Sequence, residues 1–305
     1  MTQRSGPVLV VAAAVLWGTA GTAGALAEAD SVSLAAARLV FGGAVLALVA
    51  ASSRRSAPSA STWSWGLAAA AAAVAGYQLC FFAAVQRTGV AIGTVVAIGS
   101  GPVFTGLLSW LIERTPPSRR WALGTTAAIA GCAVLVMGGA GMGGADPAGI
   151  ALALLGGLLY AFYAVVAARA IGRGTPSPVV MGVLFGGAAV IMLPVLLATG
   201  AGWPANPREL LVTVYLGCAT TALAYLLYGR GLRSTPVATA ATLALAEPAV
   251  AALLGLVVLR EQLSPISWGG LALLGLSLVV VALPAVLPGR AVASEPSPAA
   301  LGSGP

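Results

Sequence analysis

The sequence predicts an all-α polytopic membrane protein whose ten transmembrane helices form two inverted five-helix repeats. This prediction rests on three observations. Hydrophobic residues make up 59% of the 305 residues, charged residues only 8%, and the mean hydropathy is +0.98. Apolar runs of membrane-spanning length recur along the chain, and the second half repeats the pattern of the first. One soluble core could not bury this much apolar material, so lipid must be the main solvent.

A helix needs roughly 20 apolar residues to cross the hydrocarbon core of a bilayer. Runs of this kind predict spanning helices over residues 7–27, 31–51, 63–85, 89–112, 120–140, 147–170, 178–199, 209–230, 235–259 and 264–287. The gaps are rich in Pro, Gly, Ser and Arg, which suit turns in water, and none could house a soluble domain. The first run also imitates a cleavable signal peptide, but the repeat described below needs it, so we expect it to remain.

The arginines predict the orientation. If the amino terminus is cytoplasmic, eleven of the fifteen fall in inside loops or at the termini: Arg4, Arg54, Arg55, Arg114, Arg119, Arg120, Arg169, Arg173, Arg230, Arg233 and Arg290. The outside loops then hold only Arg87, Arg208 and Arg260. Because basic residues are enriched in cytoplasmic loops, we expect both termini in the cytoplasm and the chain in the plasma membrane. The same bias accounts for the net charge of +7, so we expect no nucleic-acid partner.

The residue inventory argues against an enzyme. The chain has no histidine, and its three cysteines lie in separate apolar runs, so we expect no zinc site, no other metal and no cofactor. Without histidine there is no Ser–His couple and no HExxH metal site. The only aspartates, Asp30 and Asp146, fall in predicted loops, which excludes a paired-aspartate protease within the membrane. An intramembrane enzyme remains an alternative with little support from the residues.

Two segments of the chain align without a gap. They are RTGVAIGTVVAIGSGPVFTGLLSW from Arg87 and RSTPVATAATLALAEPAVAALLGL from Arg233. In both, a proline follows the arginine by fifteen positions, and Pro102 and Pro248 are 146 positions apart, as are the two arginines. Five spans per copy is an odd number, so the second copy enters the membrane from the opposite side. Inverted repeats are typical of secondary transporters, because two equivalent halves can open a central site alternately to either side.

The repeat predicts the domain organisation. We expect a first repeat over residues 7–140 and a second over residues 147–287. The remaining residues, 288–305, are rich in Pro, Ala, Ser and Gly and are expected to form a disordered cytoplasmic tail.

Three motifs point to a known family. They are LWGT at residues 16–19, Arg38 within AAARLVFGGAVLAL, and EPAVAALLGLVVLREQLSPISWGGLALLGLSLVV at residues 247–280. By these the chain resembles the EamA-type members of the drug/metabolite transporter superfamily over nearly its whole length. The resemblance implies a helix bundle around a central cavity and, commonly, export of amino acids, metabolites or toxic compounds. The two halves differ, however, because the first has Gly101 where the second has Glu247.

Two charged residues inside spans are candidates for a binding site. Glu247 lies near the middle of the ninth span, where a lone charge costs roughly 2.5–3.5 kcal/mol. It could bind a proton or pair with a cationic substrate, or it could satisfy backbone groups that Pro248 frees. Arg38 lies about two turns into the second span and could attract an anionic group, although a contact with backbone carbonyls or snorkelling to the interface is the reading we favour.

The other candidates are aromatic or amide side chains within spans, able to line a cavity while offering a hydrogen bond or a ring face. They are Trp17, Gln78, Tyr160, Tyr163 and Tyr225. For any one of them, packing is an equally simple explanation.

Glycine and proline suggest where helices pack and bend. Gly182 and Gly186 form a small-xxx-small pair, which predicts a close approach of two helix backbones. Pro102 and Pro248, each near mid-depth, are candidate hinges for alternating access.

The sequence therefore predicts a secondary transporter that exports a small metabolite, amino acid or drug-like compound by alternating access. Its expected partners are the small-molecule substrate and the lipid bilayer, with protons if transport is proton-coupled. A facilitative uptake carrier of the same fold or a channel are alternatives, and the chain could act as a monomer or a homodimer. The substrate itself is left open, because small and aromatic residues suit many solutes.

Overall fold

The computed structural model describes residues 5–26, 31–54, 65–138, 146–199 and 207–283, which form helices and short connections without any strand. The helices are α1 (Ser5–Ala25), α2 (Ser31–Arg54), α3 (Trp65–Thr88), α4 (Val90–Glu113), α5 (Arg119–Met137), α6 (Pro147–Gly172), α7 (Ser177–Ala198), α8 (Pro207–Tyr215), η2 (Leu216–Leu223), α9 (Ala224–Gly231), α10 (Val237–Leu243), α11 (Ala246–Val258) and α12 (Pro265–Ala282). Within the described residues they make ten membrane-spanning segments, which confirms the predicted all-α architecture. The predicted tail, 288–305, lies outside these residues.

Helix ends differ from the prediction by a few residues, for local reasons. The fifth span begins at Arg119, because the Trp121 backbone N–H donates to Ser118 Oγ at 3.2 Å and caps the helix. The third span runs on to Thr88, and Gly89, with φ at 81°, then separates it from α4. Glycine suits this place because a positive φ costs it nothing.

Two spans are irregular. The eighth contains a π-helical stretch, η2, between α8 and α9. The ninth is broken into α10 and α11 at Ala244 and Leu245, just before the candidate hinge Pro248. At the break the Ala244 carbonyl accepts the Glu247 N–H at 3.0 Å, a tight turn that replaces the regular helical bond. The end of α10 is anchored to α5, because the hydroxyls of Thr125 and Thr242 lie 2.8 Å apart.

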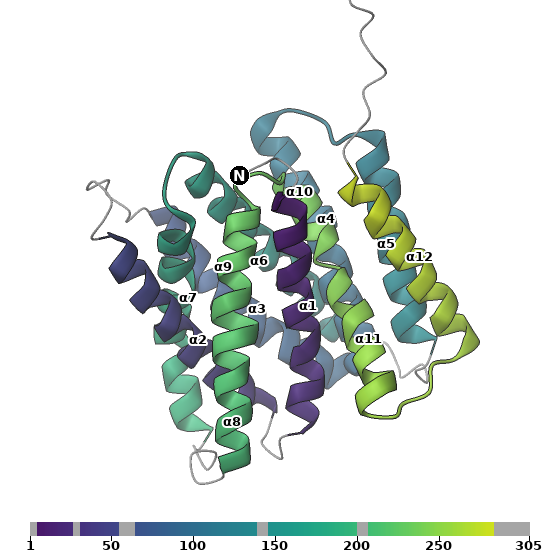
Figure 1. Cartoon of the computed structure of the whole chain (residues 1–305), viewed down its shortest axis with the longest axis horizontal. Helices are drawn as coiled ribbons and strands as arrows, with labels where there is room; N and C mark the ends of the chain where they lie inside the picture. Colours follow the sequence, from purple (N-terminus) through teal and green to yellow (C-terminus); the bar gives the residue numbers. More distant parts are fainter. Residues whose placement is uncertain (1–4, 27–30, 55–64, 139–145, 200–206, 284–305) are drawn as a thin grey trace, which may run out of the picture.

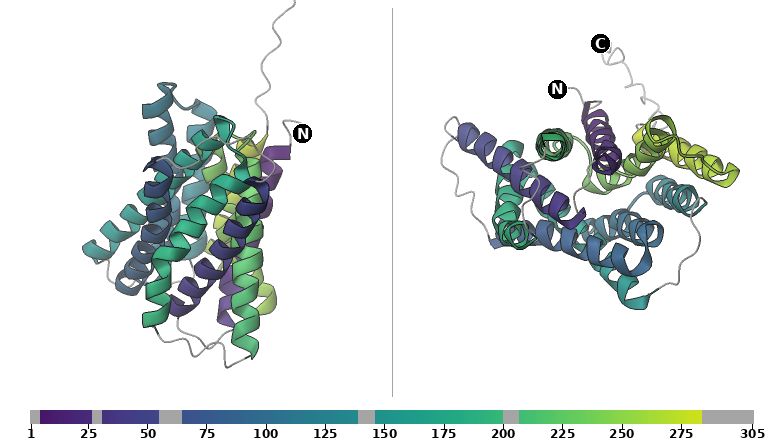
Figure 2. Two further views of the ribbon diagram at one scale, coloured as in Figure 1. Left: turned by 90° about the vertical axis from the view of Figure 1, so that its left-hand side faces the viewer. Right: turned by 90° about the horizontal axis from the view of Figure 1, so that it is seen from below.

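Helix packing is symmetric when the two halves are exchanged. Helix α1 of the first half packs against α9 and α11 of the second half. Its counterpart α6 in the second half packs against the corresponding helices of the first half, α3 and α4. The pairs α2–α7 and α5–α12 each join corresponding helices, and they lie at opposite edges of the bundle (Figures 1 and 2). This pattern is what two inverted five-helix repeats require.

Glycine allows the closest of these contacts. A Cβ added at Gly182 of α7 would overlap Ala50 and the Leu46 carbonyl of α2, and one at Gly186 would lie 3.1 Å from Ala47 Cβ. The predicted close approach at this pair is therefore confirmed. At the other edge, Gly131 of α5 and Gly270 of α12 lie against each other's backbone.

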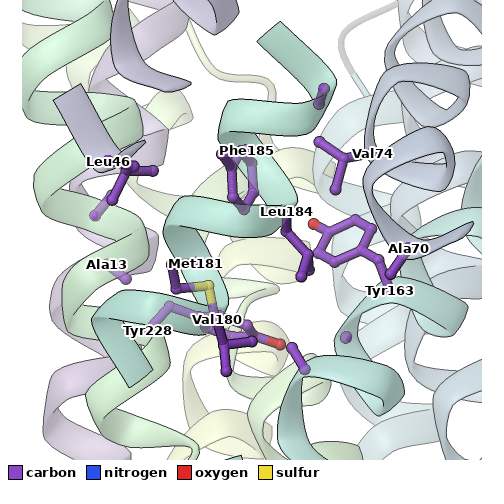
Figure 3. Close-up of a cluster of buried hydrophobic side chains, with 14 of the residues drawn as sticks. Ala13, Leu46, Ala70, Val74, Tyr163, Val180, Met181, Leu184, Phe185 and Tyr228 are labelled. Atoms are coloured by element: carbon purple, nitrogen blue, oxygen red, sulfur yellow. The ribbon is translucent and has the colours of Figure 1, made fainter. Parts of the chain in front are cut away.

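The main buried cluster lies between α1, α2, α3, α6, α7, α9 and α10. Tyr163 and Phe185 meet edge to face, with ring centroids 6.2 Å apart, beside Leu184 (Figure 3). Tyr228 and Met181 complete its centre, and all five side chains are almost fully buried. This rigid packing holds the aromatic side chains that border the cavity described next.

Candidate functional site

A cavity lies at the centre of the bundle, between helices of both repeats. It is lined by Trp17, Arg38, Tyr77, Ala97, Ile98, Tyr160, Tyr163, Tyr225, Ala241, Ala244 and Glu247. Its volume is about 60 Å³. A cavity of that size holds a few water molecules, so this conformation suits a compact solute.

The structure brings six of the seven sequence-predicted cavity residues into this one wall, from helices α1, α2, α6, α9 and α11. The exception is Gln78, which is buried but does not line the cavity; its Oε1 accepts a long hydrogen bond of 3.5 Å from Arg38 Nη2. Gln78 thus contacts the arginine rather than the cavity. Tyr77, the neighbouring residue, lines the wall instead.

Five wall residues escaped the sequence analysis. Tyr77 carried a usable signal, because it is a tyrosine in mid-span like the three that were chosen. The others, Ala97, Ile98, Ala241 and Ala244, are apolar residues in apolar helices. No feature of the sequence separates them from lipid-facing or packing positions.

Arg38 and Glu247 put opposite charges into the wall of one cavity. Among the described residues, the only salt bridge joins Arg87 and Asp146 at 3.4 Å, so the guanidinium and the carboxyl do not neutralise each other directly. Within the part of the chain that the structure describes, the Arg38 guanidinium has one hydrogen bond, the weak one to Gln78. A charge in the membrane interior is costly unless it meets a partner or water, and here the cavity is where both groups can find one.

The helix break explains how Glu247 is accommodated. It is the second residue of α11, in its first turn, and the eleventh of the 22 residues of the ninth span. A helix N-terminus carries a partial positive charge that favours a nearby carboxylate. Breaking the span at mid-depth places that charge beside Glu247, an arrangement found in transporters with discontinuous helices.

Aromatic rings form most of the remaining wall. Trp17 and Tyr225 have centroids 5.0 Å apart, Tyr160 and Tyr163 5.3 Å, and Tyr77 and Tyr160 6.1 Å. The hydroxyls of Tyr163 and Tyr225 are 3.4 Å apart. These rings are tilted or edge to face rather than stacked, and the face of an aromatic ring carries partial negative charge that can bind a cation.

Trp17 also offers a hydrogen bond. Its indole Nε1 is buried and has no hydrogen-bond partner among the described residues. A buried donor without a partner is unfavourable, so this group is available to an acceptor on a bound solute.

The candidate hinge prolines do not line the cavity themselves, and they differ in setting. Pro102 lies inside the continuous helix α4, whereas Pro248 is the third residue of α11, just after the break. A proline cannot bond the carbonyl four residues before it, and those residues are Ile98 and Ala244. Both of them line the cavity, so each half has a weakened helix ladder beside it.

The two halves contribute unequally. At Gly101 an added Cβ would lie 3.0 Å from the ring of Tyr160, so the ring occupies the space next to this glycine. At the corresponding position of the second half stands Glu247, whose backbone carbonyl lies against Gly18, the neighbour of Trp17. At the two corresponding positions the first repeat therefore leaves space that the Tyr160 ring of the second repeat fills, whereas the second repeat presents a carboxyl group.

Comparison with known proteins identifies the fold and the family. The model of the EamA-like transporter family matches this chain twice, over residues 4–137 and 147–283. The uncharacterized transporter YwfM of Bacillus subtilis (strain 168) is 38% identical over 277 residues, 90% of this chain and 92% of that protein. A crystal structure of a protein 24% identical in sequence superposes with a TM-score of 0.77, covering 92% of this chain and 96% of that one.

A further relative is the threonine/homoserine exporter RhtA of Escherichia coli (strain K12). It is 32% identical over 212 residues, which are 68% of this chain and 65% of the exporter. The RhtA of Salmonella typhimurium (strain SL1344) matches to the same extent, at 32% over 213 residues. With a family match over both repeats and transporters among its relatives, this chain is a membrane transporter rather than an enzyme, and it belongs to the EamA-like transporter family.

Proposed function

We propose that this chain exports a small zwitterionic solute, an amino acid or a close analogue, across the plasma membrane by alternating access. The observation that supports this most directly is the pairing of Arg38 and Glu247 in one small cavity without a salt bridge between them. A zwitterion carries the two complementary charges on one compact molecule.

Each end of such a solute has a counterpart in the wall. Arg38 presents a guanidinium that can bind a carboxylate through two parallel hydrogen bonds, and Trp17 Nε1 is a second free donor. Glu247 and the rings of Tyr160 and Tyr225 suit an ammonium group. The limited volume favours a solute with a short side chain.

Export is supported by RhtA, which is named a threonine/homoserine exporter. Alternating access is supported by the inverted repeats, because exchange of the packing of the two halves would open the cavity to the other face. Import by the same cycle is the competing direction, and the sign of net flux in cells distinguishes the two.

The experiment is counterflow in proteoliposomes loaded with unlabelled threonine, with labelled threonine outside. A carrier gives saturable, transient accumulation of label, whereas a channel lets threonine leak without exchange. We expect Arg38→Gln to raise the apparent KM at least about tenfold, since a hydrogen bond to a charged group contributes roughly 1.5–3 kcal/mol. Glu113→Gln, which removes an exposed carboxyl group at the end of α4 outside the cavity, is the matched control and should transport normally.

Two competitors assign the charges. Inhibition by an alkylamine that lacks the carboxylate should be unchanged in Arg38→Gln, while inhibition by a carboxylic acid that lacks the amine should be lost. Wild-type threonine counterflow in Arg38→Gln would rule out the zwitterion site.

Glu247→Gln separates two roles for this carboxyl group. If Glu247 pairs with the substrate ammonium, the variant should raise the KM of counterflow. If it carries a coupled proton, counterflow should be spared and transport driven by a pH gradient should be lost. Retention of both activities would show that Glu247 takes no part in transport.

A further inference from the structure

A second pocket lies at one end of the bundle, away from the central cavity, where α6 joins α7 and α9 ends. Its wall includes Thr175, Ser177, Arg230 and Arg233, and its volume is about 290 Å³. Because α7 begins at Ser177 and α9 ends at Gly231, the pocket lies at the ends of membrane spans. The lipid headgroups are expected at this depth.

The two arginines of this pocket have no acidic partner in the part of the chain that the structure describes, where the ion pair of Arg87 with Asp146 is the only one. Both arginines are exposed. Two neighbouring guanidinium groups repel each other unless an anion lies between them. The pocket therefore holds a concentrated positive charge that the described protein does not neutralise.

The other side of the pocket is a rigid turn that presents two hydroxyl groups. Gly174 has φ at 96°, and the Thr175 N–H donates to the Ala170 carbonyl at 3.1 Å while the Gly174 N–H donates to that of Ile171 at 3.0 Å. This is a Schellman motif, which fixes the chain leaving α6. Ser177 comes two residues after Thr175 and is only 4% exposed.

Repeat symmetry does not account for the arginine pair. Arg233 corresponds to Arg87 of the first half, and Arg230, by the same offset of 146 positions, corresponds to Ala84. Ala84 is fully buried, and Arg87 is paired with Asp146. The first repeat thus folds with an alanine in place of Arg230 and with an ion-paired arginine in place of Arg233. The fold itself does not require two unpaired arginines at this place. A basic loop that only sets topology needs no pocket whose wall contains an almost fully buried serine.

We propose that this pocket binds a phosphate group, either that of an anionic lipid or free phosphate. Phosphate oxygens accept the bidentate hydrogen bonds that guanidinium groups offer, and a tetrahedral anion can also accept from the hydroxyls of Thr175 and Ser177. Basic pockets between spans are suited to anionic headgroups. A bound lipid here would tie the α6–α7 turn to the end of α9.

The test uses the purified full-length chain in a non-ionic detergent at fixed ionic strength, with the shift in Tm as the readout. The probes are dihexanoyl-phosphatidylglycerol, dihexanoylglycerol, which has the same chains without phosphate, and inorganic phosphate. We expect phosphatidylglycerol to raise the Tm in a saturable manner and dihexanoylglycerol to have no effect. A shift with inorganic phosphate as well would identify free phosphate as a sufficient ligand, and a shift with the lipid alone would identify the headgroup together with its chains.

Variants assign the shift to the pocket. Arg230→Gln and Arg233→Gln should each weaken the apparent affinity roughly fivefold, as expected for about 1 kcal/mol per basic residue at a membrane surface, and the double variant should lose the shift. Arg119→Gln, an exposed arginine at the start of α5 outside the pocket, is the matched control and should keep it. A full shift in the double variant, an equal loss in Arg119→Gln, or no shift in the wild type would overturn the proposal. Threonine counterflow measures the central cavity and is independent of this result.

Discussion

Gly101 and Glu247 stand at corresponding positions of the two repeats. The missing side chain of the one and the carboxyl group of the other determine what the cavity wall contains. Beside Gly101 the ring of Tyr160 comes within 3.0 Å of where a Cβ would be. The carboxyl of Glu247 and the guanidinium of Arg38 have no counterpart in the other half. A polar cavity with one charge of each sign thus results from two residues that break the repeat.

Gly101→Ala tests this at the residue level. The new methyl group would displace the Tyr160 ring by a few tenths of an ångström, so we expect a severalfold higher KM for threonine counterflow and a nearly unchanged yield of folded protein. Gly99→Ala in the same helix is the control, because its Cβ would meet only a methyl group of Ile129, at 3.3 Å. Equal kinetics in the two variants would show that the position of this ring does not matter for binding.

Among the helices, α2 and α7 pack tightly enough that glycine is required. The hydrophobic effect cannot drive helix association in lipid, so close van der Waals packing has to. Gly182 provides it against Ala50, whereas Gly21 of α1 has no atom within 4 Å of its would-be Cβ. Within α1, the neighbouring Gly18 does make a close contact, with Val250 and the Glu247 carbonyl of α11, so the packing at Gly21 is a local property of its position.

The difference in packing between Gly182 and Gly21 predicts opposite effects of a glycine-to-alanine substitution on stability. Gly182→Ala should lower the free energy of unfolding by about 1–3 kcal/mol, as overpacking does, because the new methyl group would meet the Ala50 Cβ and the Leu46 carbonyl rather than the end of a flexible side chain. Gly21→Ala should be neutral or should stabilise by up to about 1 kcal/mol through helix propensity. Thermal denaturation of both variants in detergent decides, and equal stability would mean that the α2–α7 contact is not tight.

The candidate hinges Pro102 and Pro248 also act at the level of whole helices. Pro102→Ala and Pro248→Ala restore an N–H that can bond the carbonyls of Ile98 and Ala244 next to the cavity. We expect slower turnover in counterflow with an unchanged yield of folded protein, since the helices become more regular and stiffer. Pro194→Ala is the control, because Pro194 lies inside α7 at an exposed position away from the cavity. Wild-type turnover in both cavity variants would exclude hinges at these positions.

The whole molecule is organised by the odd number of spans in each repeat. Corresponding helices pair at both edges of the bundle, and the contacts of α1 with α9 and α11 reappear as those of α6 with α3 and α4 (Figure 2). Two states of one such assembly can have equal contacts with the cavity open to opposite faces. Since the described residues form ten spans, an even number, we expect the start of α1 and the end of α12 on one side of the membrane.

That side is predicted to be the cytoplasm from the arginine distribution. Fusions of green fluorescent protein, which is fluorescent in the cytoplasm, should fluoresce at either end of the chain. Alkaline phosphatase, which is active only after export, should remain inactive at both ends. Termini on different faces would be incompatible with ten spans, and two active phosphatase fusions would reverse the orientation.

The sequence by itself determined the ten spans, the inverted repeat and most of the charged and aromatic wall of the cavity. It could do so because long apolar runs need lipid, and because a polar or aromatic residue inside such a run stands out. It was silent on Ala97, Ile98 and Ala241, since an apolar residue in an apolar helix looks the same whether it faces lipid, another helix or a cavity. Only the tertiary structure decided how each helix is rotated, and this rotation placed Gln78 against Arg38. It also decided where the ninth span breaks, next to Glu247, and it placed Arg230 and Arg233 beside the α6–α7 turn. Rotation depends on neighbours distant in sequence, and in a helix that is apolar all round no periodic pattern records it.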